Sequence, residues 1–350
     1  MTEPQSDAAG DTPSVAAIDT PTVVSPPRPV WATEPPRTAW CPPEWEARLA
    51  EVASGIVQPA DGEEPIAASP EAVTIGADHG DWRLIGASRR GRLHAHRAEH
   101  REDAVAHATW PGGWCIAVAD GAGSSPYSRI GSAIVTRIFT EQIAHMVPRD
   151  VRALGTTSIG DALRESLAQA NTALRRFADD VGEPWKAFRT TLLATVVHGE
   201  HLATVQIGDG AILLRAVDGT VHHPYTPAVG EYSGEVAHFL PDEGALAVGQ
   251  ASVQITEATP YDTVVLCTDG VEDPWYPLTR YGQALLGEWS GRATDSQSLP
   301  AGYIAAAAPR VMDNARSSLA SAEALATWLA FEKRGENDDR TAAIAWRANA

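Results

Sequence analysis

Three apolar segments of the chain end in the dipeptide Asp-Gly, and this repeated pattern constrains the fold more than any other feature. The segments run from Ile116 to Gly121, from Val205 to Gly210 and from Val265 to Gly270. Each is short and apolar, as expected for a buried β-strand, and each stops abruptly at a carboxylate. A fourth acidic group, Asn337-Asp338-Asp339, precedes the last apolar segment. The sequence therefore predicts carboxylates at the ends of several strands.

These Asp-Gly pairs have two interpretations. Asp-Gly is a common turn sequence, and the Asp209-Gly210 pair, with an apolar segment on each side, predicts a hairpin turn. Alternatively, the carboxylates converge at one end of a sheet, where they would repel one another unless cations lay between them. Ligands that are all oxygen select hard ions such as Mg²⁺, Mn²⁺ or Ca²⁺ rather than zinc. The spacing of the pairs leaves both interpretations open.

Strands and helices are expected in blocks rather than in strict alternation. Apolar segments predict strands over residues 82–88, 114–120, 191–198, 202–208, 211–217, 263–268 and 341–346. Helical spacing predicts one helix after an N-cap at Ser128, a second from about Ile159 and a third over about 321–332. The block order favours an α+β fold of packed antiparallel β-sheets flanked by helices over a parallel βαβ sheet.

Composition divides the chain into three parts. Residues 1–43 contain ten prolines and few large apolar residues, so we predict a disordered, Pro-rich acidic tail there. Residues 44–80 are expected to form a short amphipathic helix followed by a linker that continues to about Asp78. Compact structure is expected from Trp82, which gives one domain over residues 81–348.

Charge and cysteine content exclude several classes of protein. The formal net charge is −18, of which residues 1–80 contribute −10 (13 Asp and Glu, 3 Arg), so nucleic acid is not an expected partner. No segment approaches the roughly 20 apolar residues of a membrane span, and the N-terminus lacks the regions of a signal peptide. The three cysteines (Cys41, Cys115, Cys267) are widely spaced, which argues against disulfides and a zinc site. We therefore expect a cytoplasmic protein; the sequence does not specify its oligomeric state.

The same acidic segments resemble the bacterial form of the type 2C (PPM-type) metal-dependent Ser/Thr protein phosphatases. The resemblance covers about residues 82–346, and its elements occur in the family's order. They are Gly86 to His94 leading to Glu102-Asp103, Val118 to Ser125 with Ser128 and Gly131, Arg189 to Leu193, Ile207 to Gly210, Thr268 to Val271, and Asp338 to Thr341. The resemblance implies two packed antiparallel sheets flanked by helices (an αββα sandwich). It also implies hydrolysis of phosphoserine and phosphothreonine in phosphorylated proteins.

The resemblance assigns site residues as well. It implies that two Mg²⁺ or Mn²⁺ ions are held by direct ligands and by two further carboxylates acting through water. The direct ligands are Asp120, which bridges the ions, the carbonyl of Gly121, Asp269 and Asp338, and the water-mediated ligands are Glu102 and Asp103. Asp209 is expected to support these ligands structurally. Two such ions activate a water that attacks phosphorus in line, and they neutralise charge on the phosphoryl oxygens.

Several positions depart from the family's pattern. Ala98 stands where many members have an Arg that binds substrate phosphate, so Arg97 or Arg101 becomes the candidate phosphate-binding residue. Lys186 stands where an Asp for a third ion is expected, and Arg189 replaces a usual Gly. These departures leave a non-enzymatic alternative open, namely a catalytically degenerate phosphatase-like module that binds phosphoproteins or other partners.

Overall fold

The computed structural model describes residues 72–147, 156–225, 238–243, 249, 251–292 and 298–348. The expected tail over residues 1–43 lies outside these residues, as does the expected amphipathic helix that follows it. No helix within the described ranges is long and apolar enough to cross a membrane.

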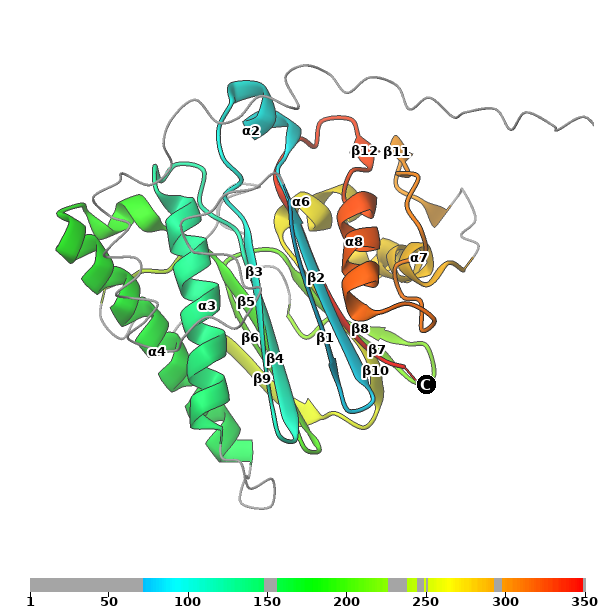
Figure 1. Ribbon diagram of the computed structural model, residues 1–350, viewed down its shortest axis with the longest axis horizontal. Helices are drawn as coiled ribbons and strands as arrows, with labels where there is room; N and C mark the ends of the chain where they lie inside the picture. The colour runs from blue at the N-terminus through cyan, green and yellow to red at the C-terminus, as the bar shows by residue number, and fades with distance from the viewer. Residues whose placement is uncertain are drawn as a thin grey trace, which may run out of the picture.

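Two antiparallel β-sheets lie face to face at the centre of the molecule (Figure 1). One sheet has the strand order β1-β2-β13-β10-β7-β8. Its strands are β1 (Ala72–His79), β2 (Trp82–Arg89), β13 (Arg340–Arg347), β10 (Tyr261–Cys267), β7 (Ala211–Ala216) and β8 (Val221–His222). The second sheet has the order β3-β4-β5-β6-β9. Its strands are β3 (Ala104–Trp110), β4 (Gly113–Ala119), β5 (Leu192–His198), β6 (His201–Ile207) and β9 (Ser252–Glu257).

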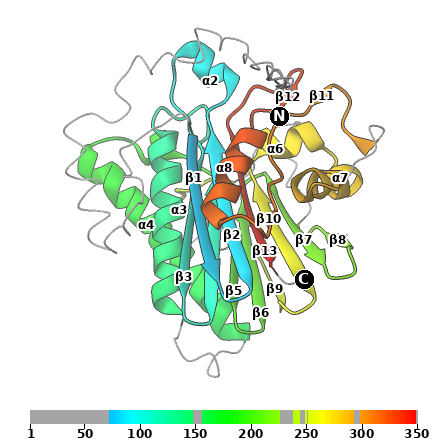
Figure 2. The same ribbon diagram turned by 45° about the vertical axis from the view of Figure 1, so that its right-hand side comes forward.

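Helices cover the outer face of each sheet, as the two ribbon views show (Figures 1 and 2). Helices α3 (Ser128–Met146) and α4 (Thr156–Val181) pack on the β3–β9 sheet, and α7 (Leu278–Ser290) and α8 (Ser318–Trp328) pack on the other. Short elements complete the fold: α2 (Arg92–Arg97), the 3-10 helices Trp185–Phe188 and Asp273–Trp275, α6 (Asp269–Glu272), β11 (Tyr303–Ile304) and β12 (Glu332–Lys333). The architecture is the predicted α+β sandwich of two antiparallel sheets flanked by helices.

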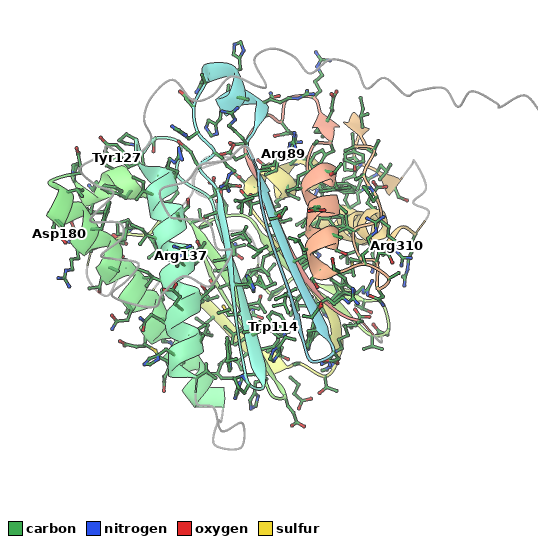
Figure 3. All side chains as sticks on the ribbon, in the orientation of Figure 1. Arg89, Trp114, Tyr127, Arg137, Asp180 and Arg310 are labelled. Carbon is green, nitrogen blue, oxygen red and sulfur yellow. The ribbon has the colours of Figure 1, made fainter. Side chains whose placement is uncertain are left out.

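The faces that the two sheets turn toward each other are joined by a continuous apolar core. Strand β4 is buried along its whole length, because one of its faces meets the opposite sheet and the other meets α3. Trp114 on β4 lies between the sheets (Figure 3) and packs edge-on against Trp82 of β2, with 5.2 Å between ring centroids. Aromatic pairs in this geometry contribute beyond their buried area. The two sheets are therefore held at a fixed separation, which fixes their strand ends relative to each other.

Three local expectations are wrong. Strand β1 occupies residues expected to form a linker, and it pairs along its whole length with β2. Helix α3 begins at Ser128 itself, with Tyr127 at the N-cap position and no side-chain cap hydrogen bond, so Ser128 is not an N-cap. The helix expected over about 321–332 ends at Trp328, and Glu332–Lys333 forms strand β12 instead.

The hairpin expected at Asp209-Gly210 is also wrong. Strand β6 pairs with β5 and β9 in one sheet, whereas β7 pairs with β10 and β8 in the other. The chain passes between the sheets at Gly208 and Gly210, which have φ values of 88° and 86°. Only glycine adopts such angles without cost. Asp209 therefore lies at the crossing between the two sheets.

This topology brings the strand ends that carry carboxylates to one end of the molecule. Strands β4 and β6 run in the same direction, because both pair antiparallel with β5, so they end at the same edge. In the other sheet, Cys267 at the end of β10 pairs with Ala211 at the start of β7 and with Ala342 near the start of β13. The residues that follow β4, β6 and β10 and precede β13 therefore gather together.

The end of β5 away from this edge generates a prediction about pH and stability. His198 is 1% exposed, and its Nδ1 accepts a hydrogen bond of 3.0 Å from Trp110 Nε1, so the ring is neutral. Burial, and then the nearby His201, lower the pKa of His198 below 6.5. As the pH falls through 6.5, His198 becomes protonated in the unfolded chain but stays neutral in the folded chain. The free energy of unfolding therefore decreases.

His198→Asn keeps an acceptor for Trp110 but removes the titration. We expect the loss of stability between pH 8 and pH 5.5, measured by urea unfolding, to be smaller in His198→Asn than in the wild type. Each unit of lowered pKa is worth about 1.4 kcal/mol. His222→Asn, at the exposed position of strand β8, serves as the control and should follow the wild-type pH dependence. An identical pH dependence in His198→Asn and the wild type would contradict the assignment.

Candidate functional site

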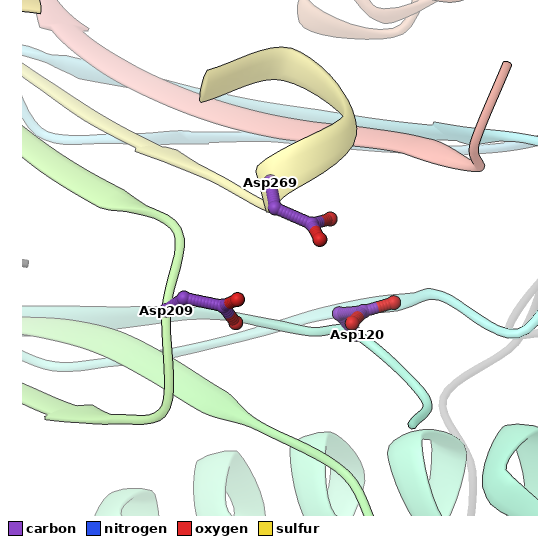
Figure 4. Close-up of side chains that lie close together, drawn as sticks. All are labelled: Asp120, Asp209 and Asp269. Carbon is purple, nitrogen blue, oxygen red and sulfur yellow. The ribbon is translucent and has the colours of Figure 1, made fainter. Parts of the chain in front are cut away.

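The three Asp-Gly carboxylates converge at the end of the sandwich. Asp120, Asp209 and Asp269 each offer a carboxylate oxygen, and these oxygens all lie within 4.8 Å of one another. Figure 4 shows the three side chains entering one small space from β4, from the β6–β7 crossing and from the start of α6. The metal-site interpretation of the repeated pattern thus has the geometry it requires, and the turn interpretation alone does not account for it.

Asp120 is held by the threonine pair that precedes β5. Its backbone N–H donates to Thr191 Oγ1 at 2.8 Å. Its carbonyl oxygen accepts hydrogen bonds from Thr191 N at 2.8 Å and Thr190 Oγ1 at 2.7 Å. Gly121 then forms a β-bridge with Thr190, and a Cβ at Gly121 would come within 2.8 Å of the Glu102 carbonyl oxygen. The Thr-Thr and Asp-Gly segments therefore fix each other at this edge.

Asp269 is positioned by the buried Thr268 that precedes it. Thr268 Oγ1 donates to Asp103 Oδ2 at 2.8 Å and accepts from Thr341 N at 3.1 Å. Gly270 approaches the Asp339 carbonyl so closely that a Cβ would overlap it, which explains the glycine in this Asp-Gly pair. One hydroxyl group thus links the end of β10, the start of β13 and the carboxylate of Asp103.

Asp339 has a role that the sequence pattern did not reveal. The Asp339 side chain is 1% exposed, and its carboxylate lies 3.0 Å from His94 Nδ1. It accepts hydrogen bonds from the backbone N–H groups of Gly91 (2.6 Å) and Glu102 (2.5 Å). Asp339 therefore holds the start of α2 and the Glu102 backbone against the β12–β13 loop. The sequence signal for this role was the pair of adjacent acids, Asp338-Asp339, because two neighbouring carboxylates are not expected to serve the same function.

Burial and mutual repulsion shift these acids in the same direction. Burial first, and then the charges of Asp269, Asp103 and Asp338, raise the pKa of Asp120 well above its usual range. Burial and the charge of Asp209 do the same to the pKa of Asp269. The pKa values of Glu102 and Asp103 rise to about 7, again chiefly through burial.

The donor set fits a hard divalent cation. Carboxylates held this close together in a partly buried site are costly, and a cation between them would remove both the repulsion and the shift in pKa. The described cysteines, Cys115 and Cys267, are buried in the sheets with their pKa raised by burial, and so offer no thiolate ligand. The arrangement can therefore hold Mg²⁺, Mn²⁺ or a similar ion through oxygen atoms.

Two further expected site residues, Asp209 and Asp338, lie near the other acids. Asp209, expected to give structural support, belongs to the group of three within 4.8 Å. Asp338, expected as a direct ligand, lies on the β12–β13 loop, and its charge contributes to the raised pKa of Asp120, Asp209 and Asp269. Glu272 at the end of α6 adds a buried carboxylate beside Asp209, with a pKa raised to about 7 mainly by burial. The sequence pattern indicated no role for Glu272.

The candidate phosphate-binding residues lie in different environments. The Arg97 side chain is 56% exposed and 3.8 Å from the Glu99 carboxylate. Arg101 is 7% exposed, and its Nη1 donates to the Asp103 carbonyl oxygen at 2.8 Å. Ala98 caps α2 in the left-handed conformation (φ 53°) and is buried. Arg101 therefore supports the Asp103 backbone, and Arg97 is the accessible one of the pair.

Comparisons with known proteins agree with this architecture. In solved structures, the chain is similar to a bacterial serine phosphatase, with a TM-score of 0.53 and 13% identity over 77% of this chain and 98% of that one. It is also similar to the serine/threonine phosphatase of S. agalactiae, with a TM-score of 0.51 and 14% identity over 76% and 99% of the two chains. At these identities the likeness concerns the fold. A search of curated proteins found no match.

The family of the chain is identified from its sequence. Residues 90–329 of the 350 match the family described as Protein phosphatase 2C. The match extends from the start of α2 to the end of α8 and includes Asp120, Asp209 and Asp269. The chain therefore belongs to the protein phosphatase 2C family.

Proposed function

We propose that this protein hydrolyses phosphoserine and phosphothreonine in proteins, using a water activated between two Mg²⁺ or Mn²⁺ ions. The observation that carries the proposal is the convergence of partly buried carboxylates from both sheets within the fold of this phosphatase family. Its substrates are cytoplasmic proteins phosphorylated on Ser or Thr. Nucleic acid and membrane are not among its partners.

The proposed ligands follow the family pattern. Asp120, Asp269, Asp338 and the Gly121 carbonyl would hold the ions directly. Asp103 and Glu102 act through water, and Asp209 supports the ligands from the sheet crossing. The short distance between Asp209 and its neighbours makes Asp209 a further candidate ligand.

When bound, the two ions supply an activated water and neutralise the charge on the phosphoryl oxygens. The chain holds the ligands in place: Thr190 and Thr191 fix Asp120, Thr268 fixes Asp103, and Asp339 fixes Glu102. Such surrounding hydrogen bonds keep a metal site within the narrow geometry that it needs. We assign substrate phosphate binding to Arg97 rather than Arg101, because Arg97 is exposed and Arg101 is bound to the Asp103 carbonyl.

The alternative is a catalytically degenerate module that binds phosphoproteins or other partners without turnover. Two observations favour it: Ala98 is buried in the cap of α2, and Lys186 carries a positive charge where an acid for a third ion was expected. The retained Asp120, Asp269 and Asp338 oppose it. Enzymatic activity is the proposal, because the departures leave the converging carboxylates intact.

The repulsion among the carboxylates gives a prediction about stability. In EDTA, Asp269→Asn is expected to unfold at a higher temperature than the wild type, by about 2 °C, because one partly buried negative charge next to other carboxylates is removed. In millimolar Mn²⁺ the order should reverse, since the variant loses a ligand and gains less stability from the ion. Thermal unfolding in both buffers measures this. Asp161→Asn, an exposed acid on α4, should behave as the wild type in both.

The same variants test metal use in another way. If Asp269→Asn is less stable than the wild type in EDTA and Mn²⁺ stabilises both proteins equally, the cluster does not hold the ion. The metal-dependent proposal would then be wrong. This result does not depend on having found a substrate.

The activity itself gives the next prediction. Purified protein with Mn²⁺ or Mg²⁺ should release phosphate from a phosphothreonine peptide and from p-nitrophenyl phosphate, and EDTA should abolish the release. Asp120→Asn and Asp269→Asn should each lower kcat/KM by at least about 100-fold, because each removes a proposed direct ligand. Asp161→Asn should retain wild-type kcat/KM.

A folded protein that binds Mn²⁺ but releases no phosphate from either compound would contradict the enzymatic proposal. It would support the binding module instead, and Ala98 and Lys186 would be the residues to revert first. Phosphate release that persists in EDTA would contradict the metal-dependent mechanism.

A further inference from the structure

Three cationic side chains surround the half-buried ring of Trp185, next to the segment that carries Asp120. The charged atoms lie 5.3 Å (Arg175 Cζ), 5.4 Å (Lys186 Nζ) and 5.5 Å (Arg189 Cζ) from the ring centroid. Arg189 also lies 5.9 Å from the ring of Phe239. These distances are within the roughly 6 Å range of a cation–π contact. We refer to Arg175, Lys186 and Arg189 on Trp185 as the Trp185 cluster.

The cluster is joined to the acidic site through the backbone. Ala122 N, two residues after Asp120, donates to the Arg189 carbonyl oxygen at 2.9 Å. Ser125 Oγ donates to the Lys186 carbonyl oxygen at 2.8 Å. Arg189 also directly precedes the threonine pair that fixes Asp120. The cluster therefore borders the site on the side of the Asp120–Ser125 loop.

Among the residues that the structure describes, the cations of the cluster form no ion pair with an acid. Within the described residues, no carboxylate lies at ion-pair distance from Lys186 or Arg189, and Arg175 donates to the carbonyl oxygen of Asp242 at 3.0 Å. Glu183 lies near Tyr127, whose pKa is raised by burial and then by the Glu183 charge. Lys186 is exposed, and Arg175, Trp185 and Arg189 are partly exposed. Three cations thus share one aromatic surface that remains accessible to solvent.

We propose that the Trp185 cluster binds a second anionic group of the phosphorylated substrate, a carboxylate or another phosphoryl group, while the acidic site takes the phosphoryl group to be cleaved. This inference rests on the proposed function and extends it to substrate choice. Three like charges around one ring repel each other, and an anion among them removes that repulsion. Guanidinium groups suit carboxylates and phosphates in particular, since both accept two parallel hydrogen bonds.

Substrate choice tests the proposal. Two phosphothreonine nonapeptides are compared, one with three Glu residues flanking the phosphothreonine and one with Gln at the same positions. We expect the wild type to show a kcat/KM for the Glu peptide higher by roughly three- to tenfold at low salt, as exposed charge pairs contribute. The preference should shrink in 0.5 M NaCl, where exposed charges are screened. A third peptide, with phosphoserine in place of one Glu, separates phosphate from carboxylate recognition.

Matched variants assign the preference to the cluster. Lys186→Gln with Arg189→Gln should reduce the ratio between the Glu and Gln peptides to about 1. Lys186→Gln alone changes only an exposed side chain and should reduce the ratio part of the way. Arg164→Gln with Arg176→Gln, two exposed positions on α4, removes the same charge elsewhere and should keep the wild-type ratio.

Binding measured in EDTA separates this proposal from the catalytic one. Fluorescence anisotropy of the labelled Glu and Gln peptides should show tighter binding of the Glu peptide by the wild type, and equal binding by the double variant of Lys186 and Arg189. Equal kcat/KM for the two peptides in the wild type, or a preference that survives in the double variant, would overturn the inference but leave the proposed function standing. If neither peptide is hydrolysed, the proposed function fails and the anisotropy comparison alone decides the inference.

Discussion

The buried carboxylate of Asp339 joins parts of the chain that lie 248 and 237 residues apart, because it accepts hydrogen bonds from the backbone of Gly91 and Glu102. Both partners precede β4, the strand that leads to Asp120, and Asp339 itself directly precedes β13. A carboxylate that accepts backbone N–H groups is a strong and directional contact, stronger than one between neutral groups. The β12–β13 loop, which carries Asp338, is thereby fixed against Glu102 and Asp103. The placement of Asp338 and Glu102 in the acidic site depends on this contact.

That geometry has an energetic cost that the rest of the fold offsets. Buried carboxylates that face one another raise each other's pKa and destabilise the folded state while no cation separates them. The continuous core between the sheets, centred on residues such as Trp114, holds the strand ends in place despite the repulsion. Stability in the core and strain at the strand ends are a common division in enzymes. Strand β4 does both, because it is fully buried and is followed directly by Asp120.

The sequence predicted the parts of the fold that depend on local patterns and missed those that depend on distant partners. Strands such as β4 and β10 are short apolar segments and were predicted correctly. The Asp209-Gly210 hairpin failed because β7 pairs with β10, more than 40 residues further along the chain, and no local signal shows this. Strand β1 was missed because its side chains are only partly buried, so it lacks the apolar pattern of a central strand.

The site shows the same division. The converging carboxylates could be inferred because each follows an apolar segment directly. The role of Asp339 could not, because its partners are backbone N–H groups on loops far away in sequence. The Trp185 cluster was hidden for a related reason: Lys186 and Arg189 are close in sequence, but Arg175 comes from α4 and Phe239 from beyond β8.

Charge on this protein acts locally, and this decides how a phosphorylated substrate approaches. The net charge of −18 opposes an acidic peptide at long range, but at physiological salt it is screened beyond about 8 Å. Within that distance a peptide meets the Trp185 cluster on one side of the Asp120–Ser125 loop and the carboxylates on the other. The carboxylates repel the phosphoryl group until cations neutralise them, whereas the cluster attracts anions at all times. On the proposed function, an acidic substrate is therefore oriented by the cluster before its phosphate reaches the carboxylates, and a neutral one is not.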